Sequence, residues 1–177
     1  MPAWVRLRLD LTTFDPAPYR EYAERARTDG ITFTSLAALG DTAEHRHRLY
    51  QLNKTCSADI PERGEFFTYD EYVATRLDVP AFRADGVLLA LDGPDWVGLS
   101  MVSLHPGDGC AFNDMTGLLR DYRGRGLSLA LKLLAVDFAR RSGLPVLRTM
   151  HHPANASAIA MNRRLGFVDD DPERAGI

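Results

Sequence analysis

The chain has 177 residues, of which 45% are apolar, 9% aromatic and 25% charged. This is the length and composition of a single globular domain, and it excludes disordered, collagen-like and coiled-coil proteins. The formal net charge of −3 gives no bulk attraction to nucleic acid and suits a basic partner or a cationic small molecule.

The longest apolar stretch covers residues 126–139 and is interrupted by Ser128, Lys132 and Asp137. It therefore falls short of the roughly 18 clean apolar residues that a membrane span needs. The N-terminus lacks the apolar run of a signal peptide, and the two cysteines form no CxxC pair. We expect a cytoplasmic protein with no membrane partner, no disulfide and no metal site.

The chain is predicted to begin with a strand and a helix. Alternating apolar residues at positions 5–11 predict a strand with one buried face. Asp15 and Pro16 then mark the start of a helix, and Gly30 marks its end. Two later helices each begin with a capping box, in which a glutamate lies three positions after the cap residue: Asp41 with Glu44, and Thr68 with Glu71.

The remaining elements are predicted from apolar runs, turns and caps. The turn at residues 92–95 joins two apolar strands into an antiparallel hairpin. A long helix from about residue 125 to residue 141 is apolar on two sides, so we expect it to be deeply packed. Besides the elements already described, the sequence predicts strands at 31–36, 87–91, 96–104, 110–119 and 145–150, helices at 41–54 and 155–164, and an extended stretch after Phe167.

Residues 116–128 carry the most informative motif, a strand that passes through a glycine-containing loop directly into the long helix. Gly124 and Gly126 let the backbone approach a ligand closely, and the first helical N–H groups have no intrahelical partners. The helix dipole, Arg123 and Arg125 add positive charge at the same place. The segment predicts a diphosphate site built mainly from backbone, although Arg-Gly-Arg-Gly taken alone could be a surface turn. Its spacing fits neither a Walker loop nor the GxGxxG fingerprint.

Two segments, YRGRGLSLALKLLAVDFAR and NASAIAMNRRLGF, resemble the acetyl-CoA-binding motifs of the GNAT N-acetyltransferase superfamily. The family pattern is Arg or Gln, two residues, Gly, one residue, and Gly or Ala. It corresponds here to Arg123, Gly126 and Ser128, of which Ser128 departs from the pattern but is small. The segments SADIP, YRGRG and NRRLGF also resemble the C-terminal half of a tandem subgroup of this superfamily.

The resemblance implies an α/β (α+β mixed) fold. It is a single GNAT-like domain whose central mixed, mostly antiparallel sheet is splayed around an acyl-CoA site and flanked by helices. Residues 31–177 would form this domain, and residues 1–30 an N-terminal strand and helix packed on the core or on a partner subunit. The family normally has a further strand after the position of Phe167. We predict that the strand at residues 5–11 fills that position, within the chain or in a homodimer.

The resemblance also assigns cofactor-binding residues. Backbone amides are implied to hold the coenzyme A diphosphate at Arg123, Gly124, Arg125, Gly126, Leu127 and Ser128. Leu118 and Leu119 are implied to pair with pantetheine like an added strand, and an N–H near Leu118 would polarise the thioester carbonyl as an oxyanion hole does. Asn155 would bond pantetheine or order its loop, or would instead cap the following helix.

The acid and base residues stay open. Asn162 occupies the position at which many family members carry the tyrosine that protonates the departing thiolate. Either Asn162 bonds the sulfur while water supplies the proton, or another group such as Ser157 serves, or catalysis is weak. His151 or His152 is a candidate base for the amine, as is Asp114, and each of them has a purely structural alternative.

We therefore expect an acetyl-CoA-dependent N-acetyltransferase that transfers the acetyl group directly to a primary amine of a small molecule or protein. The alternatives are a non-catalytic acyl-CoA-binding or regulatory module, and a phosphate-binding or structural domain. The loop at residues 53–68 is implied to form the acceptor wall, where its acids would suit an amine or would simply be solvated: Asp59, Glu62 and Glu65. Nearby aromatic residues either line an acceptor pocket or belong to the core: Tyr50, Phe66, Phe67, Tyr69 and Tyr72.

Overall fold

A computed structural model describes residues 3–171 of the chain. Within this range seven strands form one sheet with the order β2-β3-β4-β5-β6-β1-β7. The strands are β1 (Val5–Asp10), β2 (Ile31–Ser35), β3 (Val87–Asp92), β4 (Asp95–His105), β5 (Cys110–Leu118), β6 (Val146–His151) and β7 (Val168–Asp169). Neighbours β5 and β6 run parallel, and the other neighbouring pairs run antiparallel.

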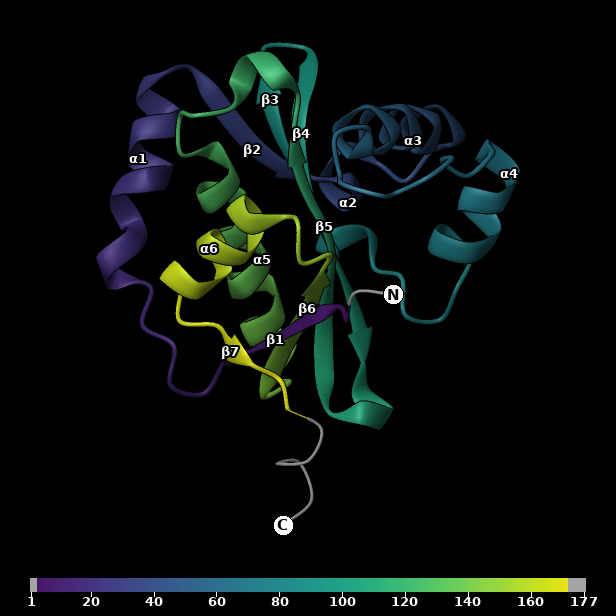
Figure 1. The fold of residues 1–177 in the computed structure, drawn as a ribbon. Coiled ribbons are helices and arrows are strands. Elements are labelled where there is room, and N and C mark those ends of the chain that lie inside the picture. The colour runs from purple at the N-terminus through teal and green to yellow at the C-terminus, as the bar shows by residue number, and fades with distance from the viewer. Residues whose placement is uncertain (1–2, 172–177) are drawn as a thin grey trace.

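Helices cover both faces of the sheet (Figure 1). Helices α1 (Arg20–Thr28), α5 (Leu127–Arg141) and α6 (Ala156–Arg164) lie on one face. On the other face lie α2 (Leu36–Leu39), α3 (Ala43–Ser57) and α4 (Tyr69–Tyr72), the last of which continues as a π-helical turn over Val73–Leu77. Among residues 3–171, none of the helices combines the length and the apolar character required to cross a bilayer.

The strands and helices predicted from the sequence are present, but two helix starts differ. The helix expected from Asp15 and Pro16 begins as a 3-10 turn over Ala17–Tyr19 and continues as α1 from Arg20. The second difference lies at the start of α3. Thr42, and not Asp41, caps this helix, because the Thr42 hydroxyl accepts a hydrogen bond from the His45 N–H. The Asp41 carboxylate instead accepts two hydrogen bonds from the guanidinium of Arg46. Because the Asp41 carboxylate is bound by Arg46, it does not cap the helix. The second capping box, Thr68 with Glu71, forms as predicted.

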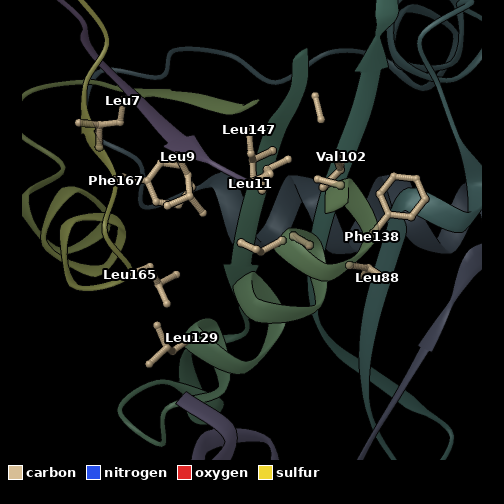
Figure 2. Close-up of a cluster of buried hydrophobic side chains, with 14 residues drawn as sticks. Leu7, Leu9, Leu11, Leu88, Val102, Leu129, Phe138, Leu147, Leu165 and Phe167 are labelled. Carbon is tan, nitrogen blue, oxygen red and sulfur yellow. The ribbon is translucent and has the colours of Figure 1, made fainter. Parts of the chain in front are cut away.

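The N-terminal strand is an integral part of the sheet. β1 lies between β6 and β7 and pairs with both, along its whole length with β6. The prediction that this strand occupies a place in the sheet is therefore confirmed within one chain. Its inward side chains Leu7 and Leu9 join a core cluster with Leu147, Leu165 and Phe167 (Figure 2). The division into residues 1–30 and 31–177 as separate units stays a prediction.

The sheet opens between β5 and β6. Their parallel pairing covers only Cys110–Phe112 against Val146–Arg148. Beyond this point β5 continues to Leu118 paired with β4, whereas β6 continues to His151 paired with β1. A β-bulge at Asp114 in β5 coincides with the divergence, since Met115 lies opposite Met101 and Asn113 lies opposite Val102. An extra residue of this kind bends a strand and is common beside active sites.

The packing of β1 yields a stability prediction. Leu7 is fully buried, whereas its neighbour Arg6 points to solvent. We expect Leu7→Ala to lower the free energy of unfolding by about 2–5 kcal/mol and Arg6→Ala to change it by less than about 0.5 kcal/mol. Urea denaturation of both variants measures the difference. Similar small effects for the two variants would contradict the integration of β1 into the core.

Candidate functional site

The register of β4 and β5 directs one backbone N–H into the divergence. Leu119 N donates to Val97 O at 2.9 Å, which makes this pair a hydrogen-bonded one. The next pair along the strands, Gly98 opposite Leu118, is therefore non-hydrogen-bonded. The backbone N–H and C=O of Leu118 accordingly point away from β4. Since β6 no longer pairs with β5 at this level, the Leu118 N–H faces the space between the two strands.

The helix that follows this strand begins without a side-chain cap. Gly126 is its N-cap residue, in a left-handed conformation with φ of 78° that strongly favours glycine. The first intrahelical bond runs from Ala130 N to Gly126 O, so the N–H groups of Leu127, Ser128 and Leu129 have no intrahelical acceptor. Three free donors at the positive end of a 15-residue helix favour an anion there.

The arginines of the loop are held by the protein itself. The Arg123 guanidinium donates to Leu118 O at 3.2 and 3.3 Å and to the Asp59 carboxylate at 2.9 Å. Arg120 also pairs with Asp59, and these two cations hold the pKa of that carboxyl below its usual range. Arg125 donates to Asp121 O. Arg123 thus positions the loop against the end of β5.

The N-terminal helix supports the same loop. A Cβ atom added at Gly126 would lie 3.1 Å from the ring of Tyr22, which belongs to α1. The Tyr22 hydroxyl in turn accepts a hydrogen bond from Arg164 of α6 at 2.7 Å. A second hydrogen bond to Arg164 comes from the Tyr19 hydroxyl, which donates to Arg164 O at 2.9 Å. Helix α1 therefore links the loop at Gly126 to the last helix of the sheet face.

Asn162 and His151 form a pair at the end of β6. Asn162 is fully buried, and its Nδ2 donates to His151 Nε2 at 2.8 Å and to Ala158 O at 2.9 Å. Both amide hydrogens are therefore engaged, while Asn162 Oδ1 has no hydrogen-bond partner among residues 3–171. Burial, together with the nearby Lys132 charge, lowers the pKa of His151 to about 4. The ring is thus neutral at pH 7, with its proton on Nδ1.

The neighbouring His152 has a different environment. Its side chain is buried and its Nδ1 accepts a hydrogen bond from Ala154 N at 3.1 Å. The proton is accordingly on Nε2, which faces the Glu62 carboxylate at 3.1 Å. The ring also meets the edge of Trp4. These contacts fasten the loop that carries Glu62 to the end of β6.

A buried lysine lies where β5 and β6 part. Lys132 of α5 is 1% exposed, and its ammonium contacts Asn113 Oδ1 and the face of Phe167. Asn113 Oδ1 also accepts a hydrogen bond from Thr116 at 3.1 Å, and Asn113 Nδ2 donates to Met101 O at 2.9 Å. Burial without a carboxylate lowers the pKa of Lys132 to about 7. Sequence reasoning noticed Lys132 only as an interruption of an apolar run.

Asn155 stands at the N-cap position of α6 but makes no cap hydrogen bond with its side chain. Its Oδ1 lies 3.5 Å from the Ser157 hydroxyl, which donates to it. The helix-capping alternative considered from sequence therefore does not occur in this structure. The Asn155 side-chain N–H groups remain at the loop surface beside the end of β6.

A cavity of about 290 Å³ opens on the other side of the bulge, under α3 and α4. Its wall is mainly apolar and aromatic, and includes Phe67, Tyr72 and Met115. Of the aromatic residues expected near an acceptor pocket, Phe67 and Tyr72 line this cavity and the other three pack in the core cluster beside it. The three acids of the 53–68 loop are not among the lining residues, whereas Arg63 of the same loop is.

Asp114 is the acid of the cavity wall, at the bulge of β5. Enclosure by protein raises the pKa of its carboxyl above the ordinary value, and Ser103, Arg76 and His105 act less strongly in the opposite direction. The side chain still contacts solvent through the cavity mouth. Four residues along β5 separate Asp114 from Leu118, a span of about 13 Å. The cavity and the uncapped helix thus lie at two ends of one strand segment.

The family of the chain follows from comparison with known sequences. The profile of the acetyltransferase (GNAT) family matches residues 46–167, which is more than half of the chain. The protein belongs to the GNAT acetyltransferase family. Relatives named mycothiol acetyltransferase occur in Streptomyces scabiei and in a Nocardioides species. The first is 27% identical over 163 residues, covering 92% of this chain and 49% of the relative.

The Nocardioides relative is 30% identical over 159 residues, covering 81% of this chain and 52% of the relative. The chain therefore spans about half the length of these curated relatives. Among solved structures, a GCN5-related N-acetyltransferase from Sphaerobacter thermophilus has a TM-score of 0.69 at 21% identity, covering 96% of this chain and 50% of that one. A tandem GNAT protein from the clavulanic acid biosynthesis pathway has a TM-score of 0.64 at 20% identity, with the same coverage. The fold is that of a single GNAT domain, as the sequence motifs predicted.

The buried lysine makes stability depend on pH. The pKa of Lys132 is about 7 in the folded protein against its ordinary value of 10.5, so the unfolded chain binds more protons between these limits. Stability should therefore rise as pH increases from 7 toward 10.5. We expect Lys132→Met to raise Tm at pH 7 by several degrees, with the advantage shrinking toward pH 10.

Thermal denaturation at pH 7, 8.5 and 10 measures this effect, and Lys54→Met on the exposed surface of α3 is the matched control. The control should show no such pH trend. A Lys132→Met variant that is less stable than the parent at pH 7, and equally sensitive to pH, would show that the ammonium is not penalised by burial.

Proposed function

We propose that the protein is an acetyl-CoA-dependent N-acetyltransferase that acts on a primary amine of a small molecule. The observation that supports this proposal most strongly is the arrangement around β5. The Leu118 N–H faces the divergence, the uncapped start of α5 follows directly, and a small cavity with an enclosed carboxylate lies four residues back along the strand. A thioester carbonyl, a diphosphate and an amine each have a matching partner in this arrangement.

The residues that would hold acetyl-CoA fit its chemistry. The free N–H groups of Leu127, Ser128 and Leu129 suit the diphosphate, and Gly124 and Gly126 keep side chains out of its way. Arg123, Arg125 and Leu119 shape this loop. Leu118 would donate its N–H to the thioester carbonyl, and the Asn155 amide would contact pantetheine. When bound, acetyl-CoA supplies an activated acetyl group whose C–S bond breaks as the C–N bond forms.

The proton of the attacking amine needs an acceptor. Asp114 is the acid that the cavity presents, and its raised pKa improves its strength as a base. We propose that Asp114, directly or through a water molecule, receives the proton lost by the amine. The raised pKa follows from the same enclosure that selects the acceptor.

The departing sulfur needs a hydrogen-bond donor. Asn162 is ill suited to this, because both its amide hydrogens are engaged. We propose instead that Asn162 is a positioning residue that keeps His151 in the tautomer with the proton on Nδ1. The neutral Nδ1–H of His151 would then be the donor at the end of β6, and Asn162 Oδ1 a buried acceptor facing the same site.

A second candidate function is a non-catalytic acyl-CoA-binding or regulatory module. The buried amide at position 162, which offers no acidic proton, is the observation that favours it. Binding of acetyl-CoA without acetylation of any amine in a broad panel, including an acceptor of the mycothiol type, would select this function over the transferase.

The cofactor site is tested by a charge placed at the start of α5. At a hundredfold excess over Kd, acetyl-CoA should stabilise the parent by about 2.7 kcal/mol, which raises Tm by roughly 5–10 °C. Ser128→Glu should weaken binding at least about tenfold, because its carboxylate repels the diphosphate while favouring the helix dipole. Differential scanning fluorimetry over an acetyl-CoA titration measures both effects.

Ser128→Gln is the matched control, since it adds similar bulk without charge and should retain most of the affinity. Equal binding by the glutamate variant and the parent would place the diphosphate elsewhere. If the folded parent shows no rise in Tm with acetyl-CoA, the proposed function is wrong.

The proposed base is tested by Asp114→Asn. We expect kcat/KM for an amine acceptor to fall by about 10²–10⁴-fold, because the amide cannot take the proton. In the parent, kcat/KM should decline as pH falls through the raised pKa of Asp114, and this inflection should disappear in the variant. Steady-state kinetics from pH 4.5 to 9, with acetyl-CoA binding as a check on folding, provide the measurement. An unchanged profile in Asp114→Asn would assign the proton transfer to another group.

A further inference from the structure

The cavity beside β5 carries two cations as well as one acid. Arg63, from the loop between α3 and α4, and Arg76, from the π-helical turn after α4, both line it. From the sequence, the acids of this loop would either suit an amine acceptor or be solvated. Asp59 of that loop is instead engaged with Arg120 and Arg123, and Glu62 faces His152.

Neither cation forms an ion pair within residues 3–171, although the Asp114 carboxylate attracts Arg76 at longer range. Their guanidinium groups lie on aromatic rings instead, Arg63 at 4.6 Å from the centre of Phe66 and Arg76 at 5.3 Å from that of Phe67. Desolvation and, after it, repulsion from Arg76 lower the pKa of Arg63. An anion bound between them would relieve this repulsion.

The rest of the wall defines what the anion is attached to. The rest of the lining is mainly apolar, with Phe82, Val87 and Met101 among its residues, and it also includes Asn53, Ser103 and His105. The volume of about 290 Å³ is at the low end of the range for ligand sites, so the occupant is small. Asp114 is the acid in this wall among the described residues, and it lies at the bulge, on the side toward Leu118.

We infer that the acceptor is a small amine that also carries a carboxylate on an apolar body, the chemical class of an apolar α-amino acid. The carboxylate would be bound by Arg63 and Arg76, the apolar body by the cavity wall, and the amine would face Asp114. This inference rests on the proposed function, because it names the acceptor of the same site. It also accounts for two cations and one acid that line the same small cavity and are all accessible to solvent.

The test separates carboxylate recognition from turnover by using reaction products. N-acetyl-L-leucine and N-acetyl-L-leucinamide have the same shape and differ in charge, so isothermal titration of each in the presence of coenzyme A measures the contribution of the carboxylate. We expect the acid to bind at least about tenfold more tightly than the amide. Arg76→Gln and Arg63→Gln should each remove most of this preference.

Arg83→Gln is the matched control, since Arg83 is exposed near the cavity, pairs with Asp85 and does not line the cavity. It should keep the preference for the acid. Acetyl-CoA binding, measured by thermal shift, should be the same in all four proteins. Equal binding of acid and amide, no binding of the acid, or a preference that persists in Arg76→Gln would overturn the assigned acceptor class. If acetyl-CoA binding is intact in that case, the proposed function still stands; a parent that does not bind acetyl-CoA overturns the proposed function instead.

Discussion

The separation of β5 from β6 is the constraint on which the candidate site depends. The two strands share only three paired positions because each is held by a different neighbour, β5 by β4 and β6 by β1. Past that point the backbone groups of β5 that would have bonded β6 are left for another partner. The bulge at Asp114 and the hydrogen bond from Thr149 to Asn113 O mark the place where pairing ends. The N-terminal strand therefore contributes to the site by pairing with β6, where Val5 lies opposite His151.

The protein fills the base of this divergence with polar groups. Asn113, Lys132 and Thr116 form a hydrogen-bonded group that also includes Ser100, beside the apolar core. A buried ammonium without a carboxylate costs stability, so an apolar residue would pack there more favourably. Burial lowers the pKa of His151, and the nearby ammonium acts in the same direction. Stability is thus reduced at a position that influences the protonation of a group at the end of β6.

Much of the fold could be predicted from the sequence, because its local signals are strong. The alternation in residues 5–11, the turn at 92–95 and the glycine-containing loop before α5 each specify a structure by themselves. The predicted cap of α3 was wrong, because Asp41 and Thr42 are neighbours and both have side chains suitable for capping. Only the fold shows that Arg46 binds Asp41 and leaves Thr42 as the cap. The glycine-containing loop lies between β5 and α5 as predicted, but the fixed position of Arg123 depends on Asp59, which lies 64 residues away.

The cavity could not be predicted, for a physical reason. Its charged residues come from three segments without a shared motif: Arg63 from a loop, Arg76 from an irregular turn and Asp114 from a bulge. Sequence patterns report which residues share a face of one element, and a loop or a bulge has no such periodicity. The burial of Lys132 could not be predicted for a related reason. An isolated lysine in an apolar helix usually lies where the apolar face meets solvent.

We propose that the Leu118 N–H and the start of α5 together bind acetyl-CoA. The most direct measurement is an amide ¹H–¹⁵N NMR titration of protein labelled with ¹⁵N-leucine, with Leu118 and Leu127 assigned by Leu118→Met and Leu127→Met. The account predicts that both amide resonances shift on addition of acetyl-CoA, while that of Leu36, at the start of α2 on the opposite face of the sheet, stays in place. Binding that leaves Leu118 and Leu127 unshifted and moves other leucines would contradict the account.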